Sequence, residues 1–83
     1  MKKIVIHSKT YCPYCVAAKN FLKHLNLPFE EKIYSDDSPQ LLKLKEQTGW
    51  PTVPIIFVGE EMIGGFQDMK LLHETGKFLS LLQ

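Results

Sequence analysis

The only two cysteines of this 83-residue chain, Cys12 and Cys15, stand three positions apart in a Cys-Pro-Tyr-Cys sequence. On a helix this spacing places both side chains on one face, within bonding reach. Paired thiols of this kind perform thiol–disulfide exchange, in which a thiolate attacks a disulfide sulfur. A purely structural disulfide would close a very short loop and stabilise little. A zinc site needs further ligands, and none of the three histidines has ligand spacing to the pair. The pattern indicates redox chemistry.

A helix that begins at this pair determines which sulfur reacts. Pro13 suits the first helical position, where a missing N–H costs nothing, so Cys12 becomes the N-cap. Its sulfur then faces the unpaired N–H groups of Tyr14 and Cys15 and the positive end of the helix dipole. Both favour the thiolate, and such motifs lower the thiol pKa from about 8.5 to roughly 3.5–7.5. Lys9 adds a nearby positive charge.

The same helix gives the two cysteines different roles. Cys15 lies one turn inside it, where we expect less exposure and a higher pKa than for Cys12. Cys12 therefore attacks, and Cys15 resolves the mixed disulfide that forms. Pro13 and Tyr14, between the two cysteines, tune how readily the pair oxidises.

Hydrophobic periodicity and turn residues predict the elements that position this motif. The expected strands are Lys3–His7, Phe29–Tyr34, Val53–Val58 and Glu61–Ile63; the expected helices run from Cys12 to the stop at Asn26 and Pro28, from Ser38 to the stop at Gly49, from Phe66 or Gln67 to His73, and from Lys77 to Leu82. Ser8–Tyr11 is expected to be a loop. Leu41, Leu42 and Leu44 are expected to form the apolar stripe of the second helix.

The resulting order, βαβ-α-ββ-α, predicts an α/β fold in a single domain over residues 1–83. The first βαβ unit gives two parallel strands with a right-handed crossover, and the later hairpin adds two antiparallel strands. The Ile4–Ile6 run is apolar on both faces, which favours a central strand. Helices then cover both faces of a mixed four-stranded sheet.

Composition excludes several classes of partner. A formal charge of +1 gives no field that would favour nucleic acid or anionic lipid. The longest apolar run, Val53–Val58, contains a proline and is too short to span a membrane. The residues after Met1 do not resemble a signal peptide, and two cysteines in one motif are typical of a cytoplasmic protein. The chain has no arginine, so an anionic ligand must be held by lysine, backbone N–H groups or a helix N-terminus.

Three sequence blocks together resemble a dithiol glutaredoxin of the thioredoxin-fold superfamily. They are Thr10–Cys15 (TYCPYC), Thr52–Pro54 (TVP) and Gly64–Asp68 (GGFQD). The resemblance extends over the whole chain. It implies a thioredoxin-like fold, with a four-stranded mixed sheet flanked by helices.

The second and third blocks resemble the glutathione-binding parts of that family. By resemblance, Pro54 follows a cis peptide bond beside the nucleophile, and Val53, next to Thr52, offers its backbone N–H and C=O to an extended peptide. An edge-strand proline is the plainer alternative. The N–H groups of Gln67 and Asp68 would receive the γ-glutamyl carboxylate. The Asp68 side chain would pair with the glutamyl amino group, cap its helix, or do both.

Two further residues match the family, and one position departs from it. Lys9 matches a lysine near the glycyl carboxylate of glutathione, although a solvated lysine is an equal alternative, and Tyr14 would pack near the tripeptide. The family often has arginine or glutamine on the second helix to assist that carboxylate. The aligned residue here is Leu41, with Gln40 beside it, and this weakens the expected grip on the carboxylate. Trp50 either covers the rim of the site or packs inside.

The resemblance implies a glutathione-dependent thiol–disulfide oxidoreductase that reduces protein–glutathione mixed disulfides and protein disulfides. It implies no tightly bound cofactor and no metal, with glutathione as co-substrate. Glutathione and disulfide-bonded or glutathionylated proteins are the expected partners, and we expect a monomer. Two alternatives remain: an electron donor reduced by thioredoxin reductase, and a carrier of an iron–sulfur cluster held by Cys12 and glutathione.

Overall fold

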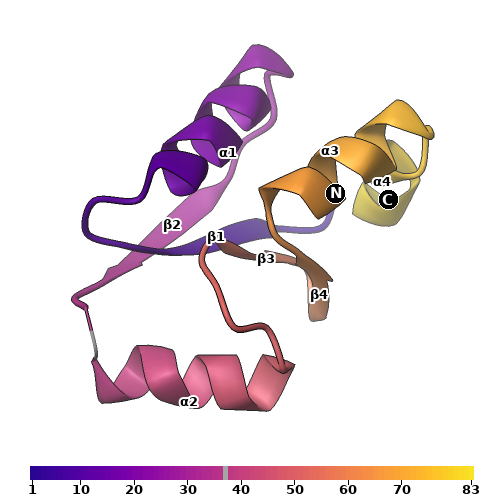
Figure 1. Cartoon of the computed structure of the whole chain (residues 1–83). Coiled ribbons are helices and arrows are strands. Elements are labelled where there is room, and N and C mark those ends of the chain that lie inside the picture. The colour runs from indigo at the N-terminus through magenta and orange to yellow at the C-terminus, as the bar shows by residue number, and fades with distance from the viewer. Residues whose placement is uncertain (37) are drawn as a thin grey trace.

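The computed structural model describes residues 1–36 and 38–83 (Figure 1). In chain order the elements are β1 (Ile4–Lys9), α1 (Pro13–His24), β2 (Glu30–Tyr34), α2 (Pro39–Thr48), β3 (Ile55–Val58), β4 (Glu61–Gly64), α3 (Phe66–Glu74) and α4 (Phe78–Leu82). The predicted element order is confirmed. Helices α1 and α3 lie over one face of the sheet and α2 lies over the other (Figure 1).

The four strands form one mixed sheet in the order β2-β1-β3-β4. β1 pairs in parallel with β2 and antiparallel with β3, and β3 pairs antiparallel with β4. The doubly apolar Ile4–Ile6 run therefore lies in an inner strand, as predicted. The predicted α/β thioredoxin-like fold class is confirmed.

β1 is longer than the sequence pattern predicts. Ser8 and Lys9 were expected in a loop, but they continue the parallel pairing, opposite Ile33 and Tyr34. Hydrophobic alternation misses this extension because Ser8 is polar yet buried, with its hydroxyl donating to a Glu31 carboxylate at 2.7 Å. The extension carries Lys9 to the end of β1, close to the start of α1.

The main core lies between the sheet and helices α1, α3 and α4. Its buried members are Ile4, Ile6, Ala18, Leu22, Ile56, Val58, Met69, Phe78 and Leu82. The rings of Phe21 and Phe66 meet edge to face with centroids 6.0 Å apart, which joins α1 to α3. Burying each large apolar side chain contributes about 1.5–3 kcal/mol, so this packing holds α1 and α3 against the sheet.

Two predictions about the other half of the chain need correction. Leu41 of α2 is buried, but Leu42 is 50% exposed, because the helix turns it away from the sheet. β3 begins at Ile55, so Val53 and Pro54 lie before the strand and keep their backbone groups outside the sheet pairing. Ser38 and Gly49 cap α2 at its two ends as predicted, and Gly49 has the left-handed conformation (φ 70°).

Candidate active site

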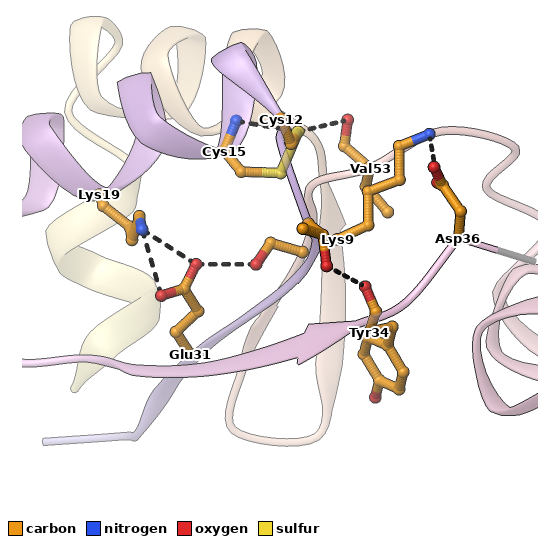
Figure 2. The surroundings of a disulfide bond; sticks show 10 residues. Lys9, Cys12, Cys15, Lys19, Glu31, Tyr34, Asp36 and Val53 are labelled. Carbon is orange, nitrogen blue, oxygen red and sulfur yellow. Dashed lines mark hydrogen bonds and ion pairs between the residues drawn. A yellow bond between two sulfur atoms is a disulfide. The ribbon is translucent and has the colours of Figure 1, made fainter. Parts of the chain in front are cut away.

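Cys12 is the N-cap residue of α1, and its sulfur is joined to that of Cys15 by a disulfide bond (Figure 2). The Cys12 backbone is extended, and the Cys15 N–H donates to Cys12 Sγ at 3.2 Å. A cap side chain accepts from the second or third helical residue, and here it is the third. Within the described residues the Cys15 N–H is the backbone donor to this sulfur, and the sulfur's approach to the Tyr14 N–H stays a prediction.

The two sulfurs differ in access as predicted. Cys15 is only 2% exposed, whereas Cys12 is partly exposed at the helix end. An attacking thiol or disulfide can therefore reach Cys12 but not Cys15. The lowered pKa of Cys12 in the reduced protein stays a prediction.

The loop before β3 approaches this sulfur from the opposite side to Cys15. The Val53–Pro54 peptide bond is cis, as the family resemblance implies. The Val53 carbonyl oxygen lies 3.9 Å from Cys12 Sγ (Figure 2). Residues far apart in the sequence thus meet at the reactive sulfur, with the polar backbone of Val53 next to it.

A glycine pair forms the third wall and leads into α3. The helix begins at Phe66, and the Gly65 N–H donates to Asp68 Oδ2 at 3.0 Å, so Asp68 caps the helix start. Gly64 has φ +117°, and a Cβ there would lie 2.7 Å from Asp68 Cγ. Only glycine fits at this position. The tight turn aims the first N–H groups of α3 at the same region as Cys12.

These three segments surround one groove of about 610 Å³. Of the predicted site residues, all but the buried Cys15 line it; they are Lys9, Cys12, Tyr14, Thr52, Val53, Pro54, Gln67 and Asp68. The volume lies within the range of small-ligand pockets. The structure therefore brings the three sequence blocks together at one site.

The structure shows how the residues at positions 40 and 41, and Trp50, lie relative to this groove, which the sequence left open. Leu41 is 2% exposed and, like Gln40, does not line it, so neither takes the place of the polar residue usual in the family. Trp50 does line it, with its indole Nε1 buried and without a hydrogen-bond partner in the described part of the chain. Trp50 is thus both a packing residue and a groove residue.

Lys45 of α2 also lines the groove, and sequence reasoning missed it. It lies four residues after Leu41, which is one helical turn, so the two residues share a helix face. That spacing is the signal that could have identified it. The other groove lysine, Lys9, pairs with Asp36 at 3.2 Å (Figure 2).

A second cavity, of about 550 Å³, lies on the other side of the disulfide, where Cys15, Lys19 and Glu31 are among its lining residues. Lys19 Nζ pairs with Glu31 at 3.1 Å, and Glu31 also accepts from the buried Ser8 hydroxyl (Figure 2). This network links α1 to β1 and β2 beneath the active cysteines.

The one histidine in β1 packs beneath the site. His7 Nδ1 lies 2.9 Å from the Tyr34 hydroxyl, and the His7 ring meets Phe57 edge to face. Burial, together with nearby Lys32, lowers the pKa of His7, and burial raises the pKa of Tyr34. Both side chains are therefore neutral at neutral pH, and their rings pack against each other.

The glutaredoxin family model matches residues 4–63, across β1, the cysteine pair and the loop before β3. The chain belongs to the glutaredoxin family. It is 43% identical over 84 residues to Glutaredoxin-C2 of Arabidopsis thaliana, covering 98% of this chain and 76% of that protein. It is 39% identical over 83 residues to a glutaredoxin of Pseudomonas aeruginosa, covering 99% and 98% of the two chains.

Among solved glutaredoxins, the fold is similar to that of a buckwheat glutaredoxin–glutathione complex. The TM-score is 0.86 at 30% sequence identity, over 98% of this chain and 76% of the buckwheat chain. The predicted family is thus confirmed, with Cys12 and Cys15 as its dithiol pair. None of the helices in residues 1–36 and 38–83 has the length and hydropathy needed to cross a membrane.

Proposed function

We propose that this member of the glutaredoxin family is a glutathione-dependent thiol–disulfide oxidoreductase that acts on protein–glutathione mixed disulfides and on protein disulfides. One observation carries the proposal: Cys12 Sγ lies at a helix N-cap, faces a ligand-sized groove, and is bonded to a buried partner, Cys15. The buckwheat relative in complex with glutathione supports glutathione as the co-substrate.

The groove lining can contact the cysteinyl and γ-glutamyl parts of the glutathione in a mixed disulfide. The Val53 backbone next to the sulfur suits the cysteinyl part of an extended tripeptide. The N–H groups of Gln67 and Asp68 at the start of α3 suit the γ-glutamyl carboxylate, because a helix N-terminus attracts an anion. Thr52 and the 61%-exposed Tyr14 form the rim against which the tripeptide packs.

In the single-cysteine route, the Cys12 thiolate attacks the glutathionyl sulfur of a mixed disulfide. The protein thiolate leaves, and Cys12 now carries glutathione. A second glutathione thiolate attacks that glutathionyl sulfur, which releases oxidised glutathione and restores the Cys12 thiolate. No electron acceptor other than the disulfide is needed.

In the two-cysteine route, Cys12 attacks a protein disulfide and forms a mixed disulfide with one of its sulfurs. Cys15 then loses its proton, attacks Cys12 Sγ and expels the second protein thiolate. This produces the disulfide present in the structure, which two glutathione molecules reduce. Glutaredoxins have reduction potentials of roughly −200 to −230 mV, which suits the cytosolic glutathione pool.

The test is turnover of a glutathione mixed disulfide, with glutathione and glutathione reductase as the reducing system. We expect Cys15→Ser to retain this activity within about threefold and to lose at least ~100-fold in reduction of a protein disulfide, because only the second route uses Cys15. Equal loss of both activities in Cys15→Ser would contradict the division of roles.

Replacing the glutathione system by thioredoxin reductase alone tests the first alternative, an electron donor that this flavoenzyme reduces directly. Faster turnover with the flavoenzyme than with glutathione would overturn the proposal. The same proposal includes a monomeric protein with no tightly bound cofactor, located in the cytoplasm. Mass measurement of the purified protein under native conditions tests the monomeric state and the lack of a bound cofactor.

A further inference from the structure

We propose that the second cavity, on the Cys15 side of the disulfide, receives the polypeptide that carries a glutathionylated cysteine, and that it favours an apolar side chain next to that cysteine. This inference rests on the proposed function and names the class of protein substrate that its single-cysteine route prefers. The second cavity has a volume of about 550 Å³, and Cys12 lines both this cavity and the larger groove. A substrate that reaches the Cys12 sulfur therefore meets both surfaces.

The chemistry of the single-cysteine route restricts where the protein part of the substrate lies. The Cys12 thiolate bonds to the glutathionyl sulfur, the bond from that sulfur to the protein breaks, and the protein leaves as a thiolate. Disulfide-bonded cysteines have Cα atoms only about 4.4–6.8 Å apart, so the protein backbone runs directly beside the glutathione. When glutathione fills the groove next to Val53, the second cavity offers a recess for the polypeptide on the free side of Cys12.

Three exposed apolar side chains line the second cavity. They are Tyr11 from the loop before α1, Val16 from α1 and Ile33 from β2, and Tyr11 is 91% exposed. Single exposed apolar residues are normal on a protein surface, but here three different segments bring them to one cavity beside a nucleophile. Tyr11 also has φ 59°, in the left-handed region that bulky residues rarely adopt, and such conformations cluster at functional sites. The three side chains therefore form a surface suited to an apolar partner group.

The charged groups at this cavity favour an apolar occupant over an anionic one. Of the two lysines that line it, Lys19 pairs with Glu31 at 3.1 Å, and Lys9 pairs with Asp36 at 3.2 Å. Both ammonium groups thus already have a carboxylate partner within the protein. A second glutathione molecule, which carries two carboxylates, would have to compete with these partners, whereas an apolar side chain would only displace water from the three apolar residues.

The experiment uses two eight-residue peptides, each with one glutathionylated cysteine, which is flanked by leucine in one peptide and by the near-isosteric asparagine in the other. Both peptides compete for the protein in one reaction, which gives the ratio of their kcat/KM values. Uncatalysed exchange of each peptide with glutathione corrects this ratio for intrinsic reactivity. We expect the wild-type protein to prefer the leucine peptide roughly five- to tenfold, at the low end of what apolar pockets achieve, because this surface is open to solvent.

The preference should depend on the residues that line the second cavity and not the larger groove. Combining Val16→Thr with Ile33→Thr should reduce it to less than about twofold, because threonine keeps the β-branched shape but adds a polar hydroxyl. Each single change should give an intermediate ratio, and the single variants carry the test if the double variant does not fold. Leu71→Thr, at a similarly exposed position of α3 outside both linings, is the matched control and should keep the full preference.

A wild-type preference below about twofold, or an unchanged preference in the variants of the second cavity, would overturn the inference. An equal loss in Leu71→Thr would also overturn it, because the effect would then not depend on this cavity. Turnover of the mixed disulfide of glutathione and 2-mercaptoethanol distinguishes the two levels. If the wild-type protein reduces this small substrate but shows no peptide preference, only the contact surface is wrong. If it reduces neither this substrate nor the peptides, the proposed function is wrong as well.

Discussion

The N-termini of α1 and α2 have the same capping arrangement, but the capping atom and its surroundings differ. Each has proline at its start and a cap side chain that accepts the N–H of the third helical residue at 3.2 Å. In α1 the acceptor is the sulfur of Cys12, and in α2 it is the hydroxyl oxygen of Ser38. Both caps satisfy an otherwise unpaired backbone donor.

Only one of the two caps becomes an active site. The Ser38 hydroxyl remains neutral at any physiological pH, so it gains a hydrogen bond but no charge stabilisation. A sulfur in the same position can ionise, and then the hydrogen bond and the helix dipole both stabilise the anion. Cys12 also faces the groove and the Val53 backbone. Capping therefore positions the sulfur, and ionisation in an accessible groove makes it reactive.

The largest expected effect comes from making the α1 cap chemically like that of α2. We expect Cys12→Ser to abolish mixed-disulfide turnover, with a loss of at least about 10³-fold, because a serine hydroxyl cannot form the covalent intermediate. Serine is also a good N-cap, so the variant should stay folded. Turnover and circular dichroism of the reduced proteins measure both effects.

The cap residue of α2 provides the control for this experiment. Ser38 lies outside the groove lining, so Ser38→Ala should leave turnover within about twofold. Residual activity of Cys12→Ser above about a hundredth of wild type, in protein free of contaminating enzyme, would contradict the assignment of Cys12 as the nucleophile.

Much of this comparison could be predicted from the sequence, because helix caps are local. Ser38-Pro39 and Cys12-Pro13 each place a cap residue before a proline, and both helices begin there. Gly49 likewise identified the end of α2. These signals depend on neighbouring residues alone and survive folding unchanged.

The errors arose where distant parts of the chain decide the outcome. Ser8 extends β1 because Glu31, from another strand, satisfies its buried hydroxyl. Leu42 is exposed because α2 turns a different face toward the sheet. Lys45 joins the site only because α2 packs beside the loop that carries Trp50. Local patterns could not supply the helix orientation on which these placements depend.

A smaller effect is expected from removing the α2 cap. Ser38→Ala loses the hydrogen bond from the Leu41 N–H, and cap removal of this kind costs about 1 kcal/mol. In a domain of this size such a loss lowers the midpoint of thermal unfolding by roughly 4–8 °C. Ser35→Ala, at an exposed serine outside the helices, is the matched control and should not shift it. Equal shifts in the two variants would mean that the cap contributes nothing specific.

The smallest expected effect distinguishes two contributions to a lowered thiol pKa, one from the helix N-cap and one from the groove. Ser38→Cys, in a protein that also carries Cys12→Ser and Cys15→Ser, places a single thiol at the α2 cap. A surface helix dipole contributes about 0.3–1 kcal/mol, so we expect the pKa of this thiol to fall by roughly half a unit from that of free cysteine. Cys12, measured as the single thiol of Cys15→Ser, should titrate lower still, because the positively charged Lys9 lines the same groove. Thiolate ultraviolet absorbance against pH gives both values.

Equal pKa values for the two thiols would assign all of the acidity to the cap. A thiol at position 38 that ionises no more easily than free cysteine would show that the cap alone does not lower the pKa of a thiol.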